Sequence, residues 1–457
     1  MLKWMGDGTM RNVYKKTMAL ALVLATSLCM SAVPAKTSEA AEGSNAMGKV
    51  PEYVIADSYD EYLSRYESAG SGTDTVTLKG SDYAEAVGMD VTVDGDTVLT
   101  GASGQITWEV NVGTAGLYQI DMEYAAVPDG GNDIQMSLLL NGELPFAQVS
   151  PLVFYRMYAN ASNDYKEMEG NQSFPPQIEV SDWQKVSLKD SEGFFGDDNG
   201  LKFYLEKGVN TLTFEAVKDR MMIRSITVRP AEELTDYASW LSDMQSQGAK
   251  MMDAGGIRIQ GEDAAFKSSP SFYPQNDRTS ALSEPYDPTY IVLNTIGGSG
   301  WKKAGDWLEW TVDVPQSGLY RIAMRYKQKD SVGFSGIRAV SINGKVPYAE
   351  AQDIRFPYSN SFQCNYLQSV AGEDLYFYFE EGTNTIRLTC ALGAYAKAAS
   401  DLRDTIDEIS EVYYSITAIT GTAPTKYQDY QLTRRLPNLT KDLQHAGERL
   451  EDIRDQI

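Results

Sequence analysis

The chain contains a long internal repeat, and this repeat restricts its possible folds more than any other feature. Residues 108–124, WEVNVGTAGLYQIDMEY, return as WTVDVPQSGLYRIAMRY at residues 310–326, an offset of 202 residues. Two further matches are 140–147 with 342–349 at the same offset, and 203–214 with 377–388 at an offset of 174. The offsets differ by 28 residues, which predicts an insertion in the first copy between about 149 and 201. The sequence therefore predicts two related domains.

Each repeated block has the pattern of β-strands. Apolar residues alternate with polar ones in the segment 108–112, so that strand has one buried face. Glycines between Val112 and Leu117 predict a hairpin turn, and the pairs Asn141-Gly142 and Asn343-Gly344 predict tight turns, because both residue types tolerate a positive φ. The predicted fold class is mainly β: two tandem antiparallel β-sandwich domains, jelly-roll-like, followed by an α-helical tail.

Helical patterns follow each copy. Pro230 and the acids after it predict a helix that ends by Gly248 and packs on a sandwich. From Leu402, apolar residues at steps of three and four predict an amphipathic helix, and a second such helix follows Pro437. The predicted domains are a signal peptide at 1–35, a flexible leader at 36–50, a first sandwich at 51–229 with an insertion at about 150–200, a helical linker at 230–254, a second sandwich at 255–393 and a helical hairpin at 394–457.

The hairpin's apolar stripe continues to Ile457, the last residue of the chain. This pattern favours a connector that leads into a further domain. The alternative is a terminal helix docked on the preceding one.

The first 35 residues have the order of an export signal. Arg11, Lys15 and Lys16 precede an apolar run at 18–33, and Val33-Pro34-Ala35 offers a cleavage site of small residues. The run is short for a membrane span, although an uncleaved anchor is the alternative. The sequence predicts a secreted or cell-envelope-associated protein. Its two later cysteines, Cys364 and Cys390, could pair or stay separate thiols.

Charge and composition exclude several function classes. The formal net charge is -23, and so acidic a surface repels phosphate backbones, so we expect no nucleic-acid partner. The single histidine, His445, argues against a catalytic triad, a Cys-His dyad or a multi-histidine metal site. Tyr (28) and Trp (7) together outnumber Phe (14), and these two types suit partly wet surfaces. We expect no enzyme activity.

Three stretches carry resemblances to known families. Residues 257–264, IRIQGEDA, and 305–326 resemble carbohydrate-binding modules of families six and thirty-five, which are β-sandwiches of secreted bacterial proteins. The resemblance covers about residues 255–392 and, more weakly, 75–229. Residues 414–437 are similar to the helical connector of long solute-binding proteins of bacterial sugar ABC transporters, where two sandwich modules precede a bilobed domain.

These resemblances imply an exported, non-catalytic carbohydrate-binding protein, the N-terminal part of a solute-binding protein for sugar uptake. The implied partners are an oligo- or polysaccharide and, through a domain absent from this sequence, a transporter permease. Two alternatives stay open: an accessory carbohydrate-binding region of an extracellular glycoside hydrolase, and a cell-surface adhesion module.

Sugar binding implies aromatic platforms at the rims of the sandwiches. The C–H face of a pyranose stacks on an aromatic ring, while its hydroxyls bond to polar side chains. The candidates are loop aromatics: Trp301, Phe356 and Tyr358 in the second copy, and Tyr155, Tyr158 and Trp183 in the insertion of the first copy. For each residue, the alternative is a ring that only covers a sandwich edge. Trp108, Trp310, Tyr118 and Tyr320 fall on strand positions and are expected in the core.

Modules of this type often hold a structural calcium ion, which needs several hard oxygen ligands. The matching positions in the second copy are Gln260 and Glu262, so an amide replaces one carboxylate. In the first copy they are Lys79 and Ser81, which cannot serve. We therefore predict no cofactor and leave calcium open only in the second sandwich.

Overall fold

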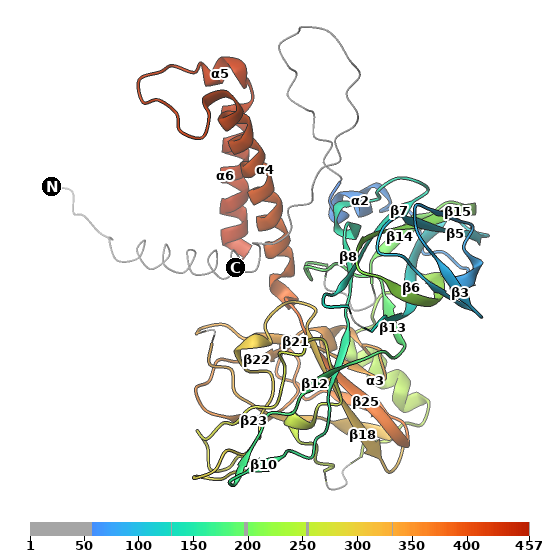
Figure 1. Cartoon of the computed structure of the whole chain (residues 1–457), viewed down its shortest axis with the longest axis vertical. Coiled ribbons are helices and arrows are strands. Elements are labelled where there is room, and N and C mark those ends of the chain that lie inside the picture. Colours follow the sequence, from blue (N-terminus) through green and yellow to red (C-terminus); the bar gives the residue numbers. More distant parts are fainter. Residues whose placement is uncertain (1–56, 129, 196–199, 253–255, 331, 457) are drawn as a thin grey trace, which may run out of the picture. The chain divides into compact units, whose positions relative to one another are not determined.

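The computed structural model of the protein describes residues 57–456, apart from 129, 196–199, 253–255 and 331. The predicted export signal and leader lie outside the described residues. The described chain divides into a β-rich unit up to residue 397 and a helical unit from residue 398 (Figure 1).

The first copy folds as a sandwich of two antiparallel sheets. One sheet has the order β13 (Gln184–Ser187), β6 (Gly116–Ala126), β16 (Met221–Pro230), β4 (Thr97–Leu99) and β3 (Thr92–Asp94), with β1 (Val76–Lys79) also on β16 and β14 (Lys202–Leu205) also on β6. The other has the order β2 (Glu85–Val87), β5 (Gln105–Val112), β15 (Gly208–Lys218), β7 (Ile134–Leu140) and β8 (Leu152–Phe154). Trp108 and Tyr118 are fully buried in its core, as predicted.

The second copy is also antiparallel, but its strands form one larger sheet and two separate strand pairs. Its larger sheet contains β17 (Phe266–Lys267), β18 (Trp307–Val314), β25 (Gly382–Cys390), β21 (Gly336–Ile342) and β22 (Ile354–Phe356) in that order. The strand pairs β19 (Gly318–Arg321) with β24 (Tyr376–Phe379), and β20 (Ala323–Tyr326) with β23 (Gln363–Tyr366), form its remaining β-structure. Trp310 is buried and Tyr320 packs against the core. The predicted fold class, mainly β with antiparallel sheets and a helical region after them, is confirmed.

A tryptophan fixes the loop before the first long strand in both copies. The Trp108 indole N–H donates to the Gly80 carbonyl oxygen at 3.2 Å, and the Trp310 indole N–H donates to the Gly261 oxygen at 2.9 Å. A buried indole N–H needs such a partner, so the same residue type serves both packing and loop position.

The turn at residues 112–117 is not the hairpin that the sequence predicts. β5 and β6 lie in different sheets, and so do β18 and β19. The chain crosses from one sheet to the other at these glycines, which lets both strands turn an apolar side to one core. The tight turns are confirmed: φ is 52° at Asn141 and 84° at Gly142, and the pair Asn343-Gly344 behaves alike.

Each sandwich also carries a short helix ahead of its strands. α2 (Tyr59–Arg65) packs Tyr59 on Phe146, with ring centroids 4.8 Å apart, and α3 (Tyr237–Ser246) packs Tyr237 on Tyr348 at 4.9 Å. The sequence pattern does not predict α2, and α3 begins later than the pattern after Pro230 predicts. Pro230 is the last residue of β16, and the side chain of Asp236 caps α3 by accepting from the Ser239 amide. α3 belongs to the second sandwich by its packing.

The middle part of the predicted insertion leaves the first sandwich and joins the larger sheet of the second, whereas β8 and β13 at its two ends stay in the first. It comprises β9 (Met157–Asn160), β10 (Glu167–Met168), β11 (Asn171–Gln172) and β12 (Gln177–Val180). β9 pairs with β17 where Tyr158 lies opposite Lys267, and β12 pairs with β9 as the edge strand. We call residues 155–183 the arm. Figure 1 shows β10 and β12 against the second sandwich.

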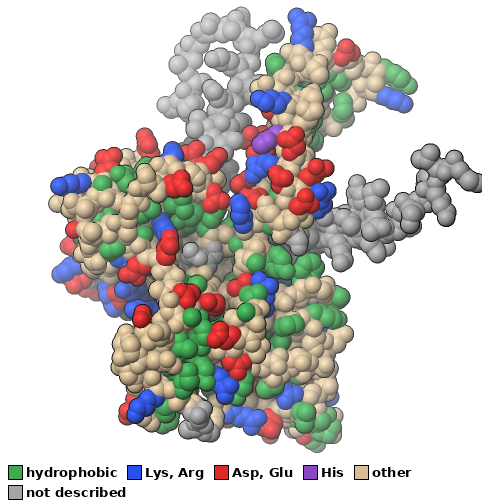
Figure 2. All heavy atoms as spheres, turned by 180° about the vertical axis from the view of Figure 1, so that it is seen from behind, with side chains coloured by type: hydrophobic (Ala, Val, Ile, Leu, Met, Phe, Trp, Pro, Cys, Tyr) green, Lys and Arg blue, Asp and Glu red, His purple; other side chains and the backbone are tan. Residues whose placement is uncertain are grey.

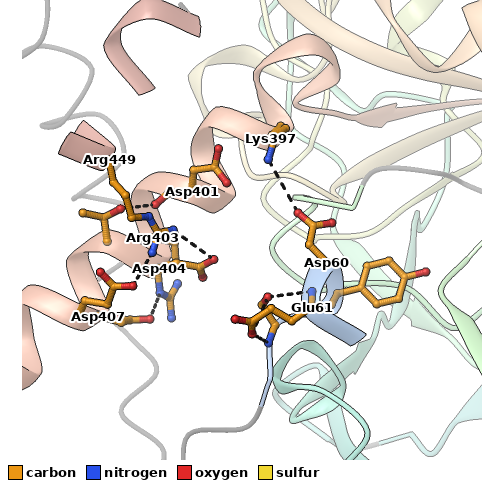
Figure 3. Close-up of polar contacts among 12 residues, drawn as sticks. Asp60, Glu61, Lys397, Asp401, Arg403, Asp404, Asp407 and Arg449 are labelled. Atoms are coloured by element: carbon orange, nitrogen blue, oxygen red, sulfur yellow. Dashed lines mark hydrogen bonds and ion pairs between the residues drawn. The ribbon is translucent and has the colours of Figure 1, made fainter. Parts of the chain in front are cut away.

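The helical unit contains α4 (Ala396–Thr420), α5 (Leu432–Arg435) and α6 (Leu439–Gln456), which confirms the two predicted amphipathic helices. α4 and α6 lie side by side in Figure 1. Arg449 of α6 contacts Glu408 and Asp404 of α4, at 2.5 and 3.9 Å, and Arg403 pairs with Asp407 along α4 (Figure 3). Among the described helices, none is long and apolar enough to cross a membrane.

Acidic side chains are spread over the face shown in Figure 2, with basic ones scattered among them. This distribution agrees with the net charge of -23. On that face the described residues offer a nucleic acid no continuous basic stripe.

Candidate ligand-binding site

A pocket of about 420 Å³ lies where the arm and the two sandwiches meet. Three parts of the chain form it: the first sandwich, through the loop before β7 and residues of β7 and β15; the arm; and two loops of the second sandwich. Its wall consists of Gly131, Asn132, Asp133, Gln135, Tyr158, Lys218, residues 268–272, Gly300, Lys303 and Asp306. Neither sandwich supplies this wall alone, and the arm contributes Tyr158 to it.

Arg156 positions the part of the wall that comes from the first sandwich. Its side chain is fully buried, and its guanidinium donates to the carbonyl oxygens of Asn132 at 2.6 Å and Val127 at 2.7 Å. It also pairs with Asp219 at 2.7 Å and with Glu179 of β12. Such multiple, charge-assisted bonds fix both the loop and the root of the arm.

Arg156 is not among the residues predicted for the site, although the sequence contains a signal for it. Leu152, Phe154 and Arg156 occupy every second position of the chain, and all three are buried, whereas the residues between them are half-buried. An arginine that continues an inward-facing apolar series must be paired, because an unpaired buried charge is costly. In the structure, Gly130 leaves room for this side chain, because a Cβ atom at position 130 would lie 1.7 Å from the Arg156 guanidinium.

Two carboxyl groups line the pocket. Asp306 is 8% exposed, and burial raises the pKa of its carboxyl to about 6, while Lys303 works in the opposite direction. The Ser268 hydroxyl donates to Asp306 at 3.3 Å. Burial also raises the pKa of Asp133, whose carboxylate accepts from the Arg156 backbone N–H at 3.5 Å. Near neutral pH these groups are strong hydrogen-bond acceptors in a partly dry site.

Tyr158 is the aromatic residue of the arm that reaches the pocket. It is half-buried and lies on β9. Tyr155 stands beside the pocket instead of lining it: its hydroxyl donates to the Ala304 carbonyl oxygen at 3.4 Å, and its own carbonyl accepts from the Tyr124 hydroxyl at 2.8 Å. Tyr155 thus joins the first sandwich to the 300–306 loop of the second. The structure brings these two predicted residues to one site.

Trp301 holds the 300–306 loop in place. Its indole N–H donates to the Asp306 carbonyl oxygen at 3.2 Å, and the Arg338 guanidinium lies 4.2 Å from its ring centroid. The ring is half-buried and packs against the core of the second sandwich. The expectation of an open platform at Trp301 needs correction, because a cation and the core already cover the ring.

Three other predicted residues lie elsewhere. Phe356 is not in a loop: it lies on β22, buried, with its ring 4.8 Å from that of Tyr326, so it offers no face to a ligand. Tyr358 is half-buried, and its hydroxyl donates to Asn360 at 3.1 Å. Trp183 has the Arg224 guanidinium 3.8 Å from its ring centroid. The described pocket wall includes none of these three.

Of the two residues predicted for calcium, Gln260 and Glu262, only Glu262 has a carboxylate. Glu262 is 3% exposed, and burial raises its pKa to about 7. Gln260 is half-buried beside it. Among the described residues, no three or more His, Cys, Asp or Glu side chains gather as a metal site. Because calcium wants several hard oxygens, these residues do not fit a carboxylate-rich calcium site.

One family model matches part of the chain: residues 397–457 match the bacterial solute-binding protein, 4-helix bundle domain. This segment contains α4, α5 and α6. A search of curated proteins gives no match.

Several solved structures resemble about a third of the chain. A family 35 carbohydrate binding module from Clostridium thermocellum is 15% identical, with a TM-score of 0.22, covering 34% of this chain and 98% of that one. A GH26-CBM35 β-(1,4)-mannanase from Podospora anserina is 18% identical, with a TM-score of 0.22, covering 37% and 34%. The C-terminal CBM6 of LamC from Zobellia galactanivorans is 14% identical, with a TM-score of 0.21, covering 34% and 99%. Scores at this level assign no ligand.

Proposed function

We propose that the protein is an exported, non-catalytic carbohydrate-binding protein and that the pocket at the root of the arm holds the sugar. The observation that carries the proposal is the composition of the wall: serine hydroxyls, two carboxyls, two lysines and the amides of Asn132 and Gln135 surround the half-buried Tyr158. A pocket of about 420 Å³ has the size of a small-ligand site.

The chemistry of the wall suits a polyhydroxylated ligand. Carboxylates accept hydrogen bonds from sugar hydroxyls, and lysine ammonium groups donate to them. The Tyr158 ring offers a flat apolar surface for the C–H face of a pyranose. A nonpolar ligand would remove water from Asp133 and Asp306 without replacing its hydrogen bonds, which is unfavourable for carboxyl groups.

We also propose that the chain is the front part of a solute-binding protein for sugar uptake, secreted or held at the cell envelope. The family match at 397–457 supports this context, and the apolar run at 18–33 supports export. In this arrangement the sandwiches would collect saccharide for a transporter permease, which a further domain would contact.

Calorimetric titration with mono- and disaccharides from mannan, xylan and laminarin tests the pocket. We expect Asp306→Asn and Tyr158→Ala to weaken binding at least tenfold, because each removes a direct partner of the sugar. Glu143→Gln is the control, since Glu143 is an exposed acid in the turn after β7. Unchanged affinity in both pocket variants would refute the site, and no binding of any saccharide by the wild type would favour the adhesion module.

Glycoside hydrolysis is a second candidate, favoured by one observation. Asp133 and Asp306 line the same pocket, and the pKa of Asp306 lies near 6, which suits a general acid. Release of reducing sugar by the wild type at pH 5 to 7, lost in Asp306→Asn, would replace the binding proposal with catalysis.

A further inference from the structure

Two exposed aromatic rings meet at the far part of the arm. Phe174 of the arm is 58% exposed and Tyr273 of the second sandwich is 37% exposed. Their ring centroids lie 5.2 Å apart in an edge-to-face arrangement. We call this pair the arm platform. Exposed rings that contact each other across two parts of the chain form a surface that neither part has alone.

The backbone around Phe174 is held against the second sandwich. The Gln172 amide donates to the Ile291 carbonyl oxygen at 2.8 Å, and the Ile291 amide donates to the Asn171 side chain at 2.8 Å. The Leu293 amide donates to the Gln172 side chain at 2.7 Å. On the other side of Phe174, Pro175 is buried. Phe174 is therefore presented from a fixed backbone, which lowers the entropy lost when a ligand binds.

The arm platform borders the pocket along one short segment. Ser271 lines the pocket and is exposed, Phe272 lines it from the core, and Tyr273 follows. Two Cα steps separate Ser271 from Tyr273, so these Cα atoms are at most about 7.6 Å apart. The exposed Tyr273 therefore follows directly on the pocket wall and is near enough for a chain-like ligand that extends past Ser271.

We infer that the arm platform is a second subsite for the same ligand, so the ligand is an oligosaccharide that extends from the pocket onto Phe174 and Tyr273. This inference rests on the proposed function. A saccharide chain fits both regions, because its hydroxyls suit the polar pocket and its C–H faces suit the open rings. The arm then sets the minimum length of the ligand that is bound tightly.

A length series tests the inference. Manno-, xylo- and laminari-oligosaccharides of one, two, four and six units are titrated into the full chain. For the series that binds, we expect the wild-type affinity to rise about tenfold between two and six units. Phe174→Ala and Tyr273→Ala should each remove most of that rise and leave the affinity for one and two units unchanged. Tyr427→Ala is the control, because Tyr427 is 90% exposed in the helical unit.

The outcomes separate the two proposals. If short saccharides bind and the gain with length persists in Phe174→Ala and in Tyr273→Ala, the subsite is refuted and the pocket stands. If affinity does not depend on length in the wild type, the subsite is again refuted. If no saccharide binds, the proposed function fails first. A matching loss in the Tyr427→Ala control would refute the assignment to the arm platform.

Discussion

The two sandwiches share their internal contacts and differ in how the chain continues after one strand. Phe154 packs on Tyr124 with ring centroids 5.2 Å apart, and Phe356 packs on Tyr326 at 4.8 Å in the same relative positions, 202 residues later. Two residues beyond each phenylalanine the copies diverge. The first copy has Arg156 and continues into the arm, whereas the second has Tyr358 at the equivalent position.

The residues that stabilise each sandwich are therefore not the same as those that distinguish the candidate site. Contacts that both copies possess build each sandwich, and the insertion that only the first copy has adds Tyr158 to the pocket wall. The second sandwich even takes β9 and β12 into its larger sheet. Open sheet edges favour this kind of strand addition. A duplicated fold therefore gains a ligand site through one insertion that joins the copies.

The largest effect is expected at the point where the copies diverge. Arg156→Ala should lower the free energy of unfolding by about 3 kcal/mol, because it leaves Glu179 and Asp219 without their buried partner. Tyr358→Ala, the equivalent change in the second copy, should lower it by less than about 1 kcal/mol. Urea unfolding measures both. Equal losses in the two variants would contradict the distinct role of Arg156.

A smaller effect is expected from pH. Burial raises the pKa of Asp306 from 3.8 to about 6 and that of Glu262 from 4.5 to about 7, so the folded state holds these protons more tightly than the unfolded state. Their contribution to stability is present below about pH 4 and is lost as pH rises through 6 to 7. These two carboxyls should make the free energy of unfolding of the wild type fall between pH 4 and pH 7.5. In Asp306→Asn and in Glu262→Gln, that fall should each time be smaller by about 2 kcal/mol.

Urea unfolding at pH 4 and pH 7.5 measures this difference, with Glu143→Gln as the exposed control. A wild-type-like pH dependence in both variants would show that the two carboxyls are not in a desolvating environment.

The next prediction concerns Trp301 of the second sandwich, which is a test of whether its ring stabilises the fold or binds the ligand. Trp301→Ala should lower the free energy of unfolding by about 1 to 2 kcal/mol, because the half-buried ring packs on the core and under Arg338. Sugar affinity should fall as well, since the 300–306 loop loses its anchor. Thermal melting and titration measure the two effects. An unchanged melting temperature combined with lost affinity would restore the sequence-based view of an open platform.

The smallest effect is expected from calcium. Excess EDTA, followed by excess calcium chloride, should leave the melting temperature unchanged, because Glu262 is the one carboxylate at the predicted position and the described residues form no larger acidic group there. A rise of several degrees with calcium would show that backbone and amide oxygens complete a site around Glu262.

Much of the fold could be predicted, because it depends on local patterns. The alternation around Trp108 and Trp310 identified core strands, and the Asn-Gly pairs identified turns with positive φ. The same local patterns predicted a hairpin at 112–117, and this prediction is wrong. A turn has the same sequence pattern whether its two strands pair with each other or lie in different sheets. The sequence also predicted a loop at Phe356, although the offset of 202 residues matches Phe356 with Phe154, and both side chains are buried.

The candidate site was accessible to sequence reasoning only in part. Tyr155 and Tyr158 could be singled out as aromatics of the insertion. Asp133, however, lies in a loop of the first sandwich, whereas Lys303 and Asp306 lie in a loop of the second, and no spacing in the sequence reveals that these two loops meet. Arg156 carried a signal in its alternation with Leu152 and Phe154, and the signal was outweighed by the usual exposure of arginine.

The amino-acid order by itself determined two sandwiches, their cores, their tight turns and the helices after them, because short-range periodicity decides which side of each element meets water. Only the tertiary structure decided where the insertion goes. Its strands pair with residues about 110 positions away, such as Tyr158 with Lys267, and long-range pairing depends on which sheet edge is open and near. The pocket and the arm platform both result from that one choice of partner.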